Sequence, residues 1–181
     1  SVKPQQVQTQ PQHRAEQLLE IMRIVNQTLV DLGGHLRQFI VDDKGVVLIG
    51  TFGLIRQQDD AGIALGAART MHSCLAEKGV KITVGVTLGA VFCGLVGVAT
   101  IRCEYAVMGP SVNLAARLMA SSTNDGVLCD ETVQSRCSAN WEFRKCPPIV
   151  AKGYSAPVVV FRPVRRRPKM VLALSPKDDT E

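Results

Sequence analysis

The block of residues 85–117, GVTLGAVFCGLVGVATIRCEYAVMGPSVNLAAR, constrains the fold of this chain more than any other segment. Apolar side chains alternate with others over 80–88, which is the pattern of a half-buried β-strand. This strand runs into a glycine-spaced segment, with Gly89, Gly94 and Gly97. Because glycine has no Cβ, such positions allow two backbones to approach closely or a positive φ angle. The first part of the block therefore predicts a strand that enters a tightly packed segment.

The second part of the block predicts a strand followed by a helix with two polar side chains on one face. A polar connection at 100–104 leads to a β-rich run at 105–108. The turn at 109–111, Gly-Pro-Ser, indicates a helix start, since proline fits the first helical turn and serine can cap free N–H groups. Asn113 and Arg117 are four residues apart, so both project from one helical face. That face offers an amide and a permanent cation, as a sugar-phosphate ligand requires.

Three motifs of this block resemble the catalytic domains of class III nucleotide cyclases: FCGLVG at 92–97, EYAVMG at 104–109 and VNLAARLM at 112–119. Specifically, they resemble the second half, termed C2, of the bicarbonate-responsive soluble adenylyl cyclases. Weaker similarity in DKG at 43–45 and AKG at 151–153 extends the resemblance over 14–163. A V-N-L-A-A-R helix directly after a strand and a Gly-x-Ser turn is much more specific than a glycine pattern alone.

The resemblance implies an enzyme made of two cyclase domains, with the nucleotide at their interface. One half supplies two carboxylates that hold Mg²⁺ or Mn²⁺, and the other supplies an asparagine, an arginine and the pocket for the base. This chain resembles the second kind of half, which converts ATP to 3′,5′-cyclic AMP and pyrophosphate when paired with a metal-bearing half. By resemblance, Arg117 stabilises charge at the α-phosphorus, Asn113 orients the ribose, and Lys152 reaches the triphosphate.

The residues expected to read the purine base depart from the family pattern. They are Gln38 and Ala106, with backbone groups near Val107 as a further source of hydrogen bonds. Gln38 can donate or accept a hydrogen bond and so can read the edge of adenine, whereas the Ala106 side chain can do neither. ATP and GTP are therefore both open as substrates, and a guanylyl cyclase half is one alternative. A catalytically inactive cyclase-homology domain that serves as a dimerisation or scaffold module is another.

Charge and composition bear on the classes of partner. The formal net charge is +5, but residues 162–181 hold six Lys or Arg against three acidic residues, so little of the excess belongs to the rest of the chain. Aromatic residues make up only 4%, which leaves no stacking platform for RNA, and no nucleic-acid partner is expected. No apolar run approaches the ~18 residues that a membrane span requires. The resemblance implies a cytoplasmic, soluble intracellular protein, with association with cilia left open.

Asp42 and Asp43 are the candidates for metal ligands within the chain, since paired carboxylates on a hairpin can bind Mg²⁺. The Asp-Lys-Gly motif at 43–45, however, matches the hairpin of the cyclase half that holds no metal. A solvated turn is the favoured interpretation, and the metal ions are expected in the partner half.

The pattern of the whole chain predicts one α+β domain over 14–163, preceded by a linker at 1–13 and followed by a basic tail at 164–181. The predicted helices and strands are helices at 14–32, 60–77 and 130–137, a hairpin of 35–41 with 46–52, and strands at 126–129, 141–144 and 158–161. They indicate an antiparallel-rich sheet with helices on one face. The resemblance implies a ferredoxin-like core that opens with a strand. Nothing before Arg14 matches that strand, so it is expected to be absent from this chain.

Overall fold

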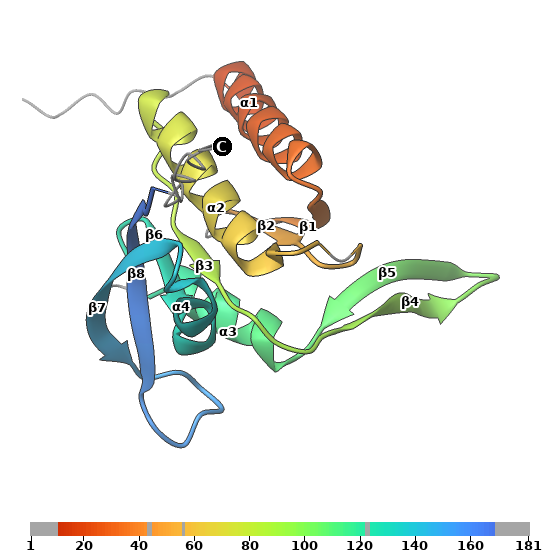
Figure 1. The fold of residues 1–181 in the computed structure, drawn as a ribbon. Coiled ribbons are helices and arrows are strands. Elements are labelled where there is room, and N and C mark those ends of the chain that lie inside the picture. The colour runs from red at the N-terminus through yellow and green to blue at the C-terminus, as the bar shows by residue number, and fades with distance from the viewer. Residues whose placement is uncertain (1–10, 43–44, 56, 122–123, 169–181) are drawn as a thin grey trace, which may run out of the picture.

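The computed structural model describes residues 11–42, 45–55, 57–121 and 124–168. Their helices and strands, in chain order, are α1 (Pro11–Asp31), β1 (His35–Asp42), β2 (Gly45–Thr51), α2 (Asp60–Glu77), β3 (Val84–Val86), β4 (Phe92–Val98), β5 (Arg102–Met108), α3 (Pro110–Met119), β6 (Val127–Asp130), α4 (Glu131–Cys137), β7 (Trp141–Ile149) and β8 (Val158–Arg166) (Figure 1). The predicted α+β class is confirmed. None of the helices in these ranges is long and apolar enough to cross a membrane.

The strands form three separate sheets. β1 pairs with β2, β4 pairs with β5, and the remaining strands form a sheet in the order β3-β6-β8-β7. Every pairing is antiparallel except that of β3 with β6. Within the described residues no strand precedes α1 in the chain. No described strand bridges β2 and β3 by hydrogen bonds, so the β1–β2 hairpin and the four-stranded sheet remain separate.

Helices α1 and α2 pack on one face of the β1–β2 hairpin. Their shared core contains Leu29 of α1 and Leu75 of α2, with Leu36 of β1 and Leu48 of β2 packed against it. α2 begins where the Asp59 carboxylate accepts a hydrogen bond from the Gly62 N–H at 3.0 Å, the usual way of satisfying a free helix N-terminus. The helix spans 60–77, as the sequence predicts.

The four-stranded sheet is covered on both faces, whereas the sequence predicts helices on one. Val127 and Cys129 of β6 pack with α2 and α4, in a core that includes Leu65. Leu128 between them packs with Leu118 of α3. Successive side chains of a strand point to opposite faces, so α2 and α4 cover one face and α3 covers the other.

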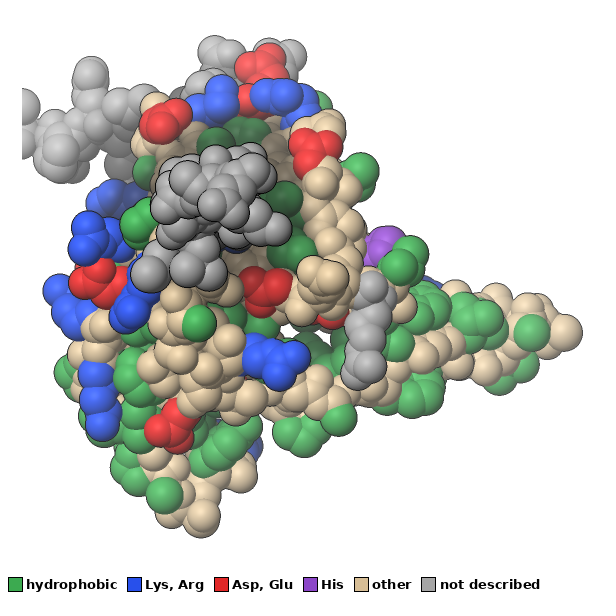
Figure 2. All heavy atoms as spheres, viewed as in Figure 1, with side chains coloured by type: hydrophobic (Ala, Val, Ile, Leu, Met, Phe, Trp, Pro, Cys, Tyr) green, Lys and Arg blue, Asp and Glu red, His purple; other side chains and the backbone are tan. Residues whose placement is uncertain are grey.

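The glycine-spaced segment forms a hairpin that projects from the body of the molecule, which we call the arm (92–108; Figure 1). β4 and β5 pair from Phe92↔Met108 to Val98↔Arg102, so the segment predicted as a polar connection at 100–104 already contains the start of β5. Apolar side chains of the arm are exposed, among them Leu95 at 71% and Ile101 at 83%. Figure 2 shows these apolar side chains along the arm, and no neighbouring element covers them there.

Several predicted boundaries differ from the observed ones. The strand predicted at 80–88 contracts to β3, because Val80 and Ile82 contribute to the α1–α2 core without joining the sheet. α1 begins at Pro11, within the predicted linker. β8 continues past residue 163 to Arg166, where it remains paired with β7 through Trp141↔Arg166.

Asp130, at the junction of β6 and α4, is a buried carboxylate with a testable pH dependence. The residue is 6% exposed, and its Oδ1 accepts a hydrogen bond from the Val133 N–H at 3.0 Å. Burial raises the pKa of this carboxyl above its ordinary value. The folded state then binds the proton more tightly than the unfolded state. The free energy of unfolding should therefore fall as pH rises through the interval between the unfolded pKa and the raised folded pKa.

We expect Asp130→Asn, which keeps the cap, to flatten this pH dependence, and Asp130→Ala to cost about 1 kcal/mol through loss of the cap. Urea unfolding of the three proteins across the carboxyl titration range measures both effects. An unchanged slope in the asparagine variant would show that Asp130 does not cause the pH dependence.

Candidate active site

Helix α3 carries the two polar side chains that the sequence singles out. Its N-cap is Gly109, Pro110 occupies the first turn, and the Asn113 N–H donates to the Gly109 carbonyl oxygen at 3.2 Å. The predicted serine cap is wrong, because no side chain caps this helix. Instead, the Thr87 hydroxyl donates to the carbonyl oxygen of Ser111 at 2.8 Å, which ties the start of α3 to the segment after β3.

The other end of α3 is fixed by Asn124, which sequence reasoning missed. Asn124 is 7% exposed; its Nδ2 donates to the carbonyl oxygens of Leu118 at 3.0 Å and Val84 at 3.2 Å. Its Oδ1 accepts from the Gly126 N–H at 3.0 Å. An asparagine beside Asp-Gly signals only a turn in the sequence, not a link between a helix and a strand.

Close packing against β3 also holds α3 in place. A Cβ at Gly85 would lie 2.1 Å from the carbonyl oxygen of Ala115, so only glycine allows the helix to come this near the strand. Leu114 and Leu118 anchor the helix in the core beneath. The side chains on its outer face are therefore presented from a rigid element, as a catalytic site requires.

Asn113 and Arg117 are both exposed on this outer face. Among the described residues, neither side chain has a hydrogen-bond or ion-pair partner. Their amide and guanidinium groups are thus available to a ligand. The spacing inferred from the sequence is confirmed, since both residues lie within one continuous helix.

The residues predicted to read the base lie on two strands that approach each other. Gln38 lies on β1, opposite Ile49 of β2, and Ala106 lies on β5, opposite Gly94 of β4. The neighbouring residues make the contact: the Arg37 guanidinium carbon lies 4.7 Å from the centre of the Tyr105 ring. The structure therefore brings this part of β1 to β5.

Val107 and Lys152 differ in their surroundings. Val107 is 3% exposed as a whole residue, so both its side chain and its own backbone are buried. Lys152 is exposed in the loop between β7 and β8, next to buried Ala151. Figure 1 shows this loop well away from the β1–β2 hairpin, so the structure does not bring Lys152 beside Gln38.

Arg37 is the residue near this site that sequence reasoning passed over. It is the extra residue of a β-bulge, because Leu36 pairs with Gly50 while Gln38 pairs with Ile49. A bulge breaks the alternation on which a face assignment from sequence depends. No signal in the sequence could have placed the Arg37 side chain.

Comparison with known proteins identifies the family. The family described as "Adenylate and Guanylate cyclase catalytic domain" matches residues 12–161. The chain belongs to this family. Adenylate cyclase type 10 of Rattus norvegicus is 30% identical over 147 residues, which cover 78% of this chain and 9% of the relative. The human adenylate cyclase type 10 is 33% identical over 125 residues, which cover 66% of this chain and 8% of the relative. This cyclase domain thus spans less than a tenth of those proteins.

Solved structures share the fold of this cyclase domain. The adenylyl cyclase CyaB from P. aeruginosa matches with a TM-score of 0.76 at 23% identity, covering 88% of this chain and 86% of that chain. The guanylate cyclase domain of RhGC from Catenaria anguillulae, in complex with GTP, matches with a TM-score of 0.75 at 15% identity, covering 88% of each chain. One neighbour is thus an adenylyl cyclase and the other a guanylate cyclase.

The described part of the cyclase domain offers no ligand set for Mg²⁺ or Mn²⁺. In it, no three His, Cys, Asp or Glu side chains come together where they could hold a metal ion. Asp43 and the side chain of Asp42 lie outside the described residues.

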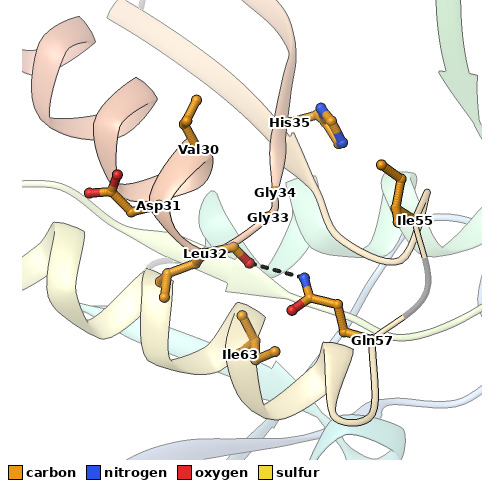
Figure 3. Close-up of a pocket in the computed structure, with 9 residues that line it drawn as sticks. All are labelled: Val30, Asp31, Leu32, Gly33, Gly34, His35, Ile55, Gln57 and Ile63. Atoms are coloured by element: carbon orange, nitrogen blue, oxygen red, sulfur yellow. Dashed lines mark hydrogen bonds between the residues drawn. The ribbon is translucent and has the colours of Figure 1, made fainter.

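A pocket of about 460 Å³ in the cyclase domain lies apart from α3, between the end of α1, the start of β1 and the loop before α2 (Figure 3). Val30, Leu32, Ile55 and Ile63 give it a mostly apolar lining. Gln57 crosses it, and its Nε2 donates to the Leu32 carbonyl oxygen at 3.1 Å. None of the predicted site residues lines this pocket, so we do not assign the nucleotide to it.

Proposed function

We propose that this cyclase domain is the C2-type half of an adenylyl cyclase, which converts ATP to 3′,5′-cyclic AMP and pyrophosphate together with a metal-bearing half. One observation carries the proposal: Asn113 and Arg117 are exposed, side by side, on a helix fixed at both ends. The similarity to the adenylate cyclase type 10 proteins supports adenine as the base.

In the proposed reaction the 3′-hydroxyl loses its proton to water, its oxygen attacks the α-phosphorus, and the bond to the bridging oxygen of pyrophosphate breaks. Negative charge grows on the oxygens around the α-phosphorus during this step. Arg117 stabilises that charge with guanidinium N–H groups that are already in place. Asn113 orients the ribose so that the 3′-oxygen lies in line with the bond that breaks. Mg²⁺ or Mn²⁺, held by the partner half, would activate the 3′-hydroxyl and screen the triphosphate.

Lys152 and the base-reading residues complete the proposed site. Lys152 is exposed in its loop and would pair with the triphosphate from there. Gln38 and backbone groups near Val107 would contact the base, while Ala106 adds no hydrogen bond.

The arm provides the surface for the second cyclase domain. Besides Leu95 and Ile101 it exposes Phe92 at 53% and Val98 at 56%, and exposed apolar surface of this kind is typical of an interaction site. A partner seated on the arm would also lie next to α3, because β5 leads directly into that helix. The nucleotide would then be bound between the two halves.

A catalytically inactive scaffold domain is the second candidate. It is favoured by Ala106, which cannot hydrogen-bond to a base, and by the lack of a metal-ligand set among the described residues. In that case the arm would still bind a partner, but Asn113 and Arg117 would have no substrate.

We expect the purified chain alone to form no cyclic AMP from ATP, and a mixture with a metal-bearing class III half to form it with Mg²⁺ or Mn²⁺. Leu95→Asp on the arm should abolish this activation, because it places a charge in the interface. Leu19→Asp, at a similarly exposed apolar position on α1 (69%), should leave activation intact. Metal-dependent turnover by the chain alone would exclude a half-site, and an inactive mixture would favour the scaffold.

A further inference from the structure

The bulge at Arg37 places two consecutive polar side chains on the same face of the β1–β2 hairpin. Leu36 and Leu48 pack against the α1–α2 core, and a Cβ at Gly50 would meet Leu29 of α1 at 3.0 Å, so these positions face the helices. Ile49 and Thr51 alternate with them and face the other way. Gln38 pairs with Ile49 and shares its face. Arg37, which follows Leu36, faces that same way.

This helix-remote face contains two buried polar atoms that lack partners. Among the described residues, neither the Nε of Arg37 nor the Oγ1 of Thr51 forms a hydrogen bond, although both atoms are buried. Buried polar groups in folded proteins are nearly always hydrogen-bonded, so such a pair indicates a ligand or ordered water. The Arg37 guanidinium is also held 4.7 Å from the Tyr105 ring centre, which fixes its position by a cation–π contact.

We propose that Arg37 reads the guanine edge, so that the purine site of this domain accepts GTP as well as ATP. The inference rests on the proposed function, since it takes the nucleotide base to lie between β1 and β5. It adds a specificity-determining residue that the motif pattern of the chain did not indicate.

The chemistry of the two purines supports this assignment. Guanine presents two acceptors, O6 and N7, that match the paired N–H groups of a guanidinium. Adenine presents an amino donor at N6 beside N7, which matches the amide of Gln38 and repels a second donor. The bulge puts the Arg37 and Gln38 side chains on one face of the hairpin. The site therefore contains one side chain for each purine, Arg37 for guanine and Gln38 for adenine.

Equilibrium binding of the non-cyclisable α,β-methylene analogues of GTP and ATP tests the proposal. Both analogues are titrated into the complex of the chain with a metal-bearing half. We expect Arg37→Ala to weaken the GTP analogue by about tenfold to a hundredfold and the ATP analogue by less than about threefold. Removing N7 from the ligand, as in the 7-deaza GTP analogue, should abolish most of this difference between wild type and variant.

Two further variants separate base reading from a structural role. Arg37→Lys keeps the charge and the stem but loses the planar fork, so it should also lose the preference for the GTP analogue even if Arg37→Ala folds poorly. Arg23→Ala, an exposed arginine on α1 that pairs with Glu20 at 2.9 Å, is the matched control and should change neither affinity.

Each other outcome overturns the proposal. If Arg37→Ala and Arg37→Lys weaken both analogues equally, or neither, Arg37 only braces β1 against β5. If wild type binds the ATP analogue but not the GTP analogue, the proposal fails while the adenylyl cyclase assignment stands. If wild type binds neither, the proposed function fails with it.

Discussion

Replacing Arg117 with alanine is expected to lower kcat roughly 10²–10³-fold in the enzyme assembled from this chain and a metal-bearing half. KM should change far less, because in the proposed reaction the guanidinium acts on charge that appears only in the transition state. Arg117→Lys should recover little activity, since an ammonium group does not reproduce the planar fork. Steady-state kinetics of cyclic AMP formation at saturating metal measure both parameters.

Two controls accompany this experiment: the free energy of unfolding of Arg117→Ala, and the activity of a variant of another exposed arginine. Arg117 is exposed and, within the described ranges, unpartnered, so its loss should change the free energy of unfolding by about 0.5 kcal/mol or less. Arg136 is also exposed in the last turn of a helix, α4, and Arg136→Ala should leave kcat unchanged. Near-normal turnover of Arg117→Ala would remove Arg117 from the active site and leave the scaffold as the better interpretation.

Gly85→Ala is expected to destabilise the chain by about 3 kcal/mol, at the upper end of what an overpacked core position costs. The added methyl would lie 2.1 Å from the Ala115 carbonyl oxygen and 2.9 Å from both Leu118 Cβ and the Met119 nitrogen. Most of these atoms belong to backbone that cannot turn away, so α3 must move off β3. Because α3 carries Asn113 and Arg117, any remaining folded protein should also lose activity in the assembled enzyme.

Gly66→Ala is the matched control for this glycine substitution. Gly66 lies inside α2, where an added Cβ would make an ordinary contact with Trp141 at 3.9 Å. Alanine there should stabilise the helix by roughly 0.5–1 kcal/mol. Urea unfolding of both variants measures the difference. Equal stability of Gly85→Ala and wild type would contradict the close packing of α3 on β3.

The sequence predicts the elements whose signals are local. α2 is predicted to its exact ends by an apolar helical period, and the β1–β2 hairpin by two apolar runs around a polar turn. The Gly-Pro-Ser turn and the four-residue spacing predict the helix that carries Asn113 and Arg117. The V-N-L-A-A-R motif of this helix predicts the family of the chain. What these predictions share is that each depends on residues close together in the chain.

Features set by distant contacts could not be predicted in this way. Val80 and Ile82 alternate with other residues as in a strand. In the structure they pack against the α1–α2 core and do not join a sheet. The strand predicted at 141–144 continues through Pro147 and Pro148 to Ile149 as β7, because β7 is an edge strand and tolerates missing N–H donors. The role of Asn124 and the direction of Arg37 depend on partners far away in sequence.

Helix α2 contributes side chains to two hydrophobic cores, and this determines how the chain unfolds. Leu75 of α2 lies in the core under the β1–β2 hairpin, while Leu65 and Ala68 lie in the core of the four-stranded sheet. The two regions are otherwise separate sheets, so cooperative unfolding depends on α2 remaining helical across its length. Local opening of α2 would uncouple β1 from α3, and the two regions would then exchange amide protons as independent units.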